Sequence, residues 1–149
     1  MHFGWINLFG AVIVLLMLIP NIVFAVRNKD EKHLCTNRVM NVGEQIGRYA
    51  CIILMWLPLF VWEFGFESVA QMLLYVAGNA LLLAAYLIVF ACYFKKRSKG
   101  RALALAILPA CIFLLSGILL HHWLLAGFAV LFAIAHIYVT IQNAGGAAA

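Results

Sequence analysis

Apolar residues fill five long stretches of this chain, and short polar segments separate them. The stretches cover residues 3–26, 39–62, 68–94, 102–120 and 124–142. A helix of about 20 mostly apolar residues crosses a bilayer, so each stretch is long enough for one crossing. The pattern predicts an all-α integral membrane protein, a bundle of five transmembrane helices that forms one domain over residues 1–143. Residues 144–149 are small, and we interpret them as a flexible or cloning-derived tail.

The composition changes this picture little. Hydrophobic residues make up 67% of the 149 residues and charged residues only 10%, whereas soluble domains are nearer half apolar and a quarter charged. A separate soluble domain is thus excluded. The net charge of +5 does not indicate a nucleic-acid partner, because nine of the ten Lys and Arg residues lie in two short loops. In such loops they set the orientation of the protein and contact anionic membrane lipid.

The charge of the loops predicts how the chain is oriented. The first loop and the third loop carry four and five Lys or Arg residues, at 27–38 and 95–101, while the second and fourth carry none. Loops rich in Lys and Arg stay in the cytoplasm. We therefore expect an N-terminus outside, a C-terminus in the cytoplasm, and a location in the inner membrane of a bacterial cell.

One predicted span contains a charged pair, Glu44 and Arg48. They are four residues apart with the acid first, the order in which a helical pair attracts best. Gly43 and Gly47 lie beside them in a G-x-x-x-G spacing, which favours close packing of two helices. Ionisable residues inside a membrane span are costly and often functional. Two interpretations stay open: a structural ion pair that locks helices together, or a site for a polar or anionic ligand or for a proton.

Two other spans carry polar residues on one face. The span at 68–94 has a stripe that must face other helices or a hydrated path, with Asn79 near mid-membrane; its members are Gln71, Tyr75, Asn79, Tyr86 and Tyr93. The span at 124–142 places His136, Thr140 and Asn143 on one face, and imidazole changes its charge near neutral pH. Pro20, Pro58 and Pro109 lie inside three spans, where proline allows a helix to bend.

These polar residues suggest one site. Asn21 follows Pro20 directly, and both lie near the predicted depth of the charged pair and of the span histidine, about 10 Å from the cytoplasmic boundary at 1.5 Å per residue. We therefore predict a single polar site that opens toward the cytoplasm. Its residues are Asn21, Glu44, Gln45, Arg48, His136 and Thr140, and Asn79 is a further candidate for ligand binding or proton coupling.

Neither a metal nor a cofactor is expected. The four cysteines, Cys35, Cys51, Cys92 and Cys111, form no C-x-x-C pair and are typical of packing residues. His2, His121 and His122 are predicted at the surface opposite to His136, so no pair of axial haem ligands is available. No catalytic residue is assigned.

Three functions fit this pattern. The first is transport of a small solute or ion through the polar site, which requires a homo-oligomer, most simply a dimer, because five helices seldom enclose a path alone. The second is a non-catalytic membrane subunit or regulator that binds another membrane protein through its helix faces. An enzyme that modifies lipids is the weakest of the three, because the chain has no H-E-x-x-H, paired-aspartate or nucleophile motif.

Overall fold

The computed structural model describes residues 6–29, 34–57, 59–61 and 65–146. Within these residues the chain forms five α-helices. Their bounds are α1 Leu8–Arg27, α2 Arg38–Trp56, α3 Val69–Lys95, α4 Lys99–Leu119 and α5 Trp123–Gly146.

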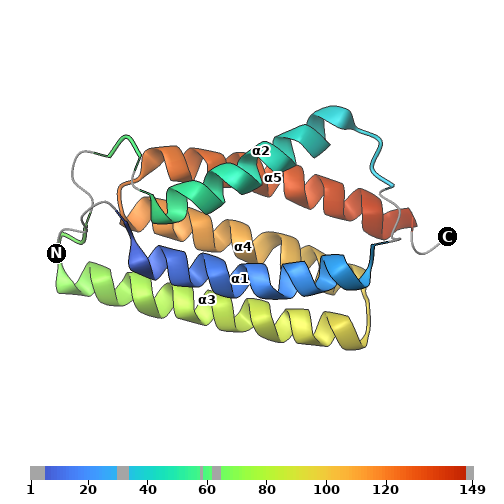
Figure 1. The fold of residues 1–149 in the computed structure, drawn as a ribbon, viewed down its shortest axis with the longest axis horizontal. Coiled ribbons are helices and arrows are strands. Elements are labelled where there is room, and N and C mark those ends of the chain that lie inside the picture. Colours follow the sequence, from blue (N-terminus) through green and yellow to red (C-terminus); the bar gives the residue numbers. More distant parts are fainter. Residues whose placement is uncertain (1–5, 30–33, 58, 62–64, 147–149) are drawn as a thin grey trace.

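Successive helices run in alternating directions along one bundle (Figure 1). The side-chain amide of Asn7, just before α1, donates to the Tyr75 hydroxyl near the start of α3. At the other end, the Arg97 guanidinium donates to the side-chain oxygen of Asn28, just after α1. Hence α1 and α3 are parallel. The end that holds Asn28 and Arg97 is named the basic end, and the end that holds Asn7 is named the opposite end.

Four of the described helices, α1, α3, α4 and α5, are long and apolar enough to cross a membrane. Large apolar side chains cover their outer faces; on α1, Val12 is 55% exposed, Leu15 61% and Ile19 58%. Exposed apolar surface of this extent marks contact with a membrane or another protein, and on helices of this length and hydropathy it indicates contact with lipid tails. The protein is therefore an all-α, multi-pass integral membrane protein. The polar residues of α2 make it less apolar, and it is not one of these four helices.

A polar side chain caps the start of each helix by accepting a hydrogen bond from the backbone, which satisfies N–H groups that have no partner inside the helix. His122 accepts from the Leu125 amide at the start of α5, through Nδ1 at 2.9 Å. The caps of the other four helices are Asn7, Asn37, Ser68 and Ser98.

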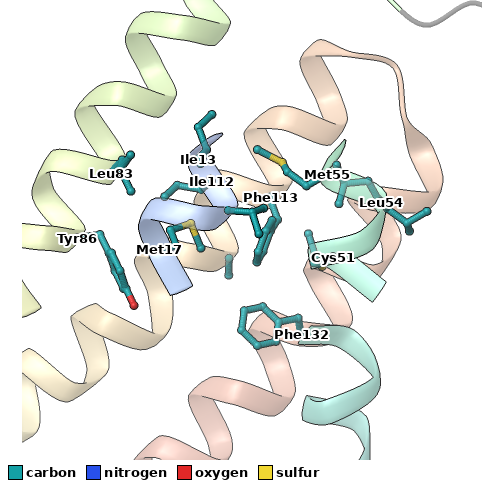
Figure 2. Close-up of a cluster of buried hydrophobic side chains, with 14 of the residues drawn as sticks. Ile13, Met17, Cys51, Leu54, Met55, Leu83, Tyr86, Ile112, Phe113 and Phe132 are labelled. Atoms are coloured by element: carbon teal, nitrogen blue, oxygen red, sulfur yellow. The ribbon is translucent and has the colours of Figure 1, made fainter. Parts of the chain in front are cut away.

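The core lies where the five helices meet. The most extensive packing joins α4 to α5, α2 to α5 and α3 to α4, whereas α1 contacts α2 and α3 less. Side chains from all five helices fill the centre, among them Met17, Met55, Leu83, Phe113 and Phe132 (Figure 2).

Two of the differences between the helix boundaries and the predicted spans concern the end of the second span and the C-terminal tail. The span predicted to run to Trp62 ends as α2 at Trp56, because a residue before proline disfavours helical backbone. Pro58, which is predicted to lie inside this span, falls outside the described residues. At the other end of the chain, α5 continues through residues 144–146, which were assigned to the tail. Residues 147–149 lie outside the described residues.

Candidate functional site

The charged pair forms a direct contact on α2. A nitrogen of the Arg48 guanidinium donates to one carboxylate oxygen, Oε1, of Glu44. The Glu44 side chain is buried, at 7% exposure, but the Arg48 side chain is 39% exposed. The Glu44 carboxylate is thus enclosed by the bundle, while the Arg48 guanidinium is partly exposed.

His136 on α5 joins this pair. Its Nδ1 lies 3.0 Å from the same Glu44 oxygen. The imidazole stacks on Phe132 one turn earlier, with ring centroids 4.8 Å apart and planes inclined by 14°. Stacking and the carboxylate contact together fix the ring. One carboxylate oxygen therefore connects an arginine on α2 with a histidine on α5.

Glycine brings α2 close enough to α5 for this contact. A Cβ added to Gly47 would lie 2.9 Å from the Phe132 Cα, closer than real Cβ contacts. At Gly43 an added Cβ would lie 3.8 Å from the Ala135 Cβ, an ordinary contact distance. Of these two glycines, Gly47 is the one at which a side chain would not fit.

A second pair of polar residues comes from α1 and α3. The side-chain amide of Asn21 donates to the Tyr86 hydroxyl at 2.6 Å and to the Met17 carbonyl at 2.8 Å. Tyr86 is only 1% exposed, and in Figure 2 it projects from α3 near Met17. The amide thus ties α1 to α3 at this level.

A half-open cavity of about 110 Å³ lies between these groups, and all five helices line it. Its polar side chains are Asn21, Arg48, Tyr86 and His136, and its apolar side chains include Leu18, Ile52 and Phe113. A cavity of about 10–15 Å³ already admits one water molecule. This cavity can therefore hold several waters or a small polar group.

The structure separates three candidates from this cavity. Gln45 is exposed on the outer face of α2, about 100° around the helix from Glu44. Thr140 lines a different depression of about 240 Å³ between the start of α4 and the end of α5, with Lys99 and Gly100. The prediction that Gln45 and Thr140 share one site with His136 is thus corrected. Asn79 lies in a second polar cluster nearer the opposite end.

This second cluster is closed. The Asn79 amide donates to the Tyr75 carbonyl at 2.9 Å, and its oxygen accepts from the Ser116 hydroxyl at 3.2 Å. The Asn7 amide donates to the Tyr75 hydroxyl at 3.1 Å and to the Met55 carbonyl at 3.2 Å. Asn7, Tyr75, Asn79 and Ser116 each have 0% exposure. Neutral groups that satisfy one another in this way serve to hold helices together.

Sequence reasoning assigned no role to two residues of these networks. Asn7 and Ser116 are isolated polar residues in apolar stretches, and only their unusual surroundings mark them. Tyr86 belongs to the polar stripe of α3, so its inward position had a signal, but its place in the cavity did not. The stripe as a whole faces neighbouring helices: Gln71 donates to the Leu119 carbonyl, and the Tyr93 ring contacts Phe24.

The side chains that line the cavity are of types that can bind a polar group or exchange a proton. Arg48 offers charged donors, Tyr86 a hydroxyl, and His136 an imidazole held against a carboxylate. Among the residues that the structure describes, no group of three His, Cys, Asp or Glu side chains could hold a metal ion. No protein-family model, curated protein or solved structure matches this chain.

Proposed function

We propose that this protein transports a small polar solute or an ion through the cavity that Asn21, Arg48, Tyr86 and His136 line. The observation that carries the proposal is the position of this cavity: it is lined by all five helices and lies beside a buried carboxylate. Polar groups inside a membrane protein commonly mark the path of an ion or substrate.

The proposal includes five membrane crossings. Since α1 and α3 are parallel and both are apolar enough to span, the chain must return between them, and α2 is the helix that makes this return. Glu44, the acid of its charged pair, is buried in the bundle. With Lys and Arg at the basic end, the positive-inside rule then places that end in the cytoplasm, together with the C-terminus.

The small volume of the cavity favours a proton or a small ion over a larger solute. Sites for drug-sized ligands have volumes of roughly 300–1,000 Å³, whereas this cavity measures about 110 Å³. His136 is the one cavity group whose side-chain type changes charge near neutral pH. Since one small bundle seldom encloses a continuous path, we propose that a homodimer completes it.

Proton flux into reconstituted vesicles tests this function. Vesicles that contain a trapped pH dye are energised by a potassium diffusion potential, and the wild-type protein should acidify or alkalise them faster than protein-free vesicles do. His136→Gln should remove this flux. His121→Gln is the matched control, because it makes the same change at a side chain that is 52% exposed at the opposite end.

Two results of this experiment would contradict the proposal. Equal flux in the His136→Gln and wild-type proteins would contradict a role for the cavity. If wild-type vesicles carry no proton, sodium, potassium or chloride current above the protein-free background, transport is the wrong function. The alternative of a membrane subunit would then gain support from a stoichiometric membrane-protein partner that copurifies with the chain.

A further inference from the structure

Two partly exposed polar side chains that line the cavity, Asn21 on α1 and Arg48 on α2, indicate that it opens between these helices. At the opposite end the two helices touch: the Asn7 amide donates to the Trp56 carbonyl at 2.8 Å, and a Cβ on Gly10 would lie 2.1 Å from the Met55 oxygen. Toward the basic end they separate, and α2 begins far from the end of α1 (Figure 1). Asn21 and Arg48 are partly exposed along this opening.

The separation has a structural cause. The segment before α2 is tied to α5, because the amides of Leu34 and Cys35 both donate to the side-chain oxygen of Asn143, at 2.9 and 3.0 Å. Gly47 then packs on the backbone of Phe132 in α5. The first half of α2 is therefore held against α5 and away from α1.

Arg48 is the charged group at this opening, and it has donors to spare. A guanidinium carries five N–H groups, and within the described residues Arg48 uses only one nitrogen, for Glu44. The adjoining walls are apolar, with Leu18 on α1 and Ile52 one turn after Arg48 on α2. Charge-assisted bonds to carboxylate, phosphate or similar oxygens are the strongest that such donors form.

We infer that the opening binds an anionic amphiphile, with its oxyanionic head on Arg48 and its apolar chain between α1 and α2. The inference goes beyond the proposed function, because it adds a second ligand of the same cavity to the transported ion. The small volume supports it: about 110 Å³ accommodates a small head but not a chain. An apolar chain remains outside the cavity, on the walls that the diverging helices leave uncovered.

The charges of the site add a condition. Glu44 and Arg48 neutralise each other, so an added anion gives the site a net negative charge unless a proton is taken up. His136 contacts Glu44 directly. In the described part of the chain, the titratable or charged groups that face this imidazole are Glu44 and Arg48 on α2 and Tyr86 on α3. Uptake of one proton together with the head keeps the site neutral, and this imidazole is a basic side chain in direct contact with Glu44.

Three probes separate the head from the chain: methanesulfonate, decanesulfonate and decanol. The sulfonate keeps one negative charge at all pH values used, so any pH dependence reports on the protein. We expect titration calorimetry of the purified full chain in neutral detergent to show saturable binding of decanesulfonate. Decanol and methanesulfonate should bind at least about tenfold more weakly, since each lacks one of the two contacts. Binding should strengthen as the pH falls from about 8 to about 6.

Substitutions test whether Arg48 binds the sulfonate head. Arg48→Gln should weaken decanesulfonate binding by about tenfold or more, as for loss of a charge-assisted bond. The Glu44→Gln/Arg48→Gln double variant should do the same while it leaves no buried carboxylate unpaired. Arg38→Gln is the matched control, because it removes the same charge from an exposed position on the same helix. Binding that is equal in Arg48→Gln and Arg38→Gln would overturn the inference.

The remaining outcomes are also informative. Saturable binding of methanesulfonate as tight as that of decanesulfonate would show that a free oxyanion, not an amphiphile, is the ligand, and would overturn the binding of an apolar chain between α1 and α2. Absence of saturable binding by either sulfonate would overturn the inference entirely. Proton flux that depends on His136 would survive that result, so failure of this inference is distinguishable from failure of the proposed function.

Discussion

The two polar clusters of this bundle use similar residues and reach opposite states. Near the opposite end, Asn7, Tyr75, Asn79 and Ser116 are neutral and fully buried, and they bond to one another or to nearby carbonyls. Toward the basic end, the site that Arg48 and His136 line contains charged groups and remains half-open. The difference follows from how α1 approaches α2, which is closely at Gly10 and loosely at Asn21.

The numbers of hydrogen-bond donors and acceptors give a second reason why the two clusters differ. In the closed cluster, each side-chain amide and hydroxyl has a hydrogen-bond partner, and no charge needs solvation. In the open site one carboxylate oxygen serves both an arginine and a histidine. A guanidinium has more donors than one carboxylate oxygen accepts. The first arrangement stabilises the bundle, and the second leaves hydrogen-bonding capacity for a ligand or water.

The largest effect is expected at Gly10, where the backbones of α1 and α2 approach each other closely beside the closed cluster. Gly10→Ala places a Cβ 2.1 Å from the Met55 carbonyl oxygen, so α1 must move and the closed cluster must open. The free energy of unfolding should fall by about 1–3 kcal/mol or more. Gly127→Ala is the control, because nothing lies within 4 Å of the added Cβ. Reversible unfolding in mixed micelles measures both, and equal stability of the two variants would contradict the close contact.

An intermediate effect should distinguish the two clusters by their asparagines. Asn79→Leu leaves the Ser116 hydroxyl without its acceptor in a dry site, and should cost about 1–2 kcal/mol of unfolding free energy. Asn21→Leu should cost only about 0.6 kcal/mol, because the Tyr86 hydroxyl borders the half-open cavity.

The functional effects of these two variants should be reversed. Proton flux per folded molecule should fall in Asn21→Leu and persist in Asn79→Leu, as measured in the same vesicles. If Asn79→Leu alone loses flux, the clusters have been assigned the wrong roles.

The smallest effect concerns pH at the opposite end. His122 lies in the turn between α4 and α5, and burial lowers its pKa below the usual range for histidine. The unfolded chain therefore binds more protons below about pH 6.5, and stability should decline as the pH falls from there. At higher pH this contribution is complete. Protonation also removes Nδ1 as acceptor for the Leu125 amide.

Comparison of wild type with His122→Asn isolates this effect, because asparagine is also a good helix cap. The decline in unfolding free energy between pH 7 and pH 5 should be smaller in the variant. An equal decline in both proteins would show that other groups cause it.

Hydropathy alone predicted the helical class and the approximate positions of the five helices, because lipid requires long apolar segments with internally bonded backbones. The order Glu44 then Arg48 likewise predicted their contact, since it depends only on spacing within one helix. The end of α2 was missed because two apolar residues, Leu57 and Leu59, flank Pro58 and extend the hydropathy pattern beyond the helix.

Which residues form the site depends on how the helices are rotated and packed against one another. No local sequence pattern specifies this packing. Asn21, Arg48 and His136 share a cavity because α2 is drawn to α5 by Asn143 and Gly47. Thr140 is one turn beyond His136 but lines a separate depression beside Lys99. Similar predicted depth was thus insufficient to decide which side chains meet.

The central claim is that the cavity beside Arg48 is open to small polar molecules while the cluster around Asn79 is closed. Cysteine accessibility tests it at two tyrosines of α3, Tyr86 and Tyr75, which are both buried and create equal space when replaced. Each Tyr→Cys variant is made in a background without the four native cysteines and treated from the basic end with a small anionic methanethiosulfonate reagent. The claim predicts rapid modification of Tyr86→Cys and protection of Tyr75→Cys. Equal rates at the two positions, or modification at Tyr75→Cys alone, would contradict it.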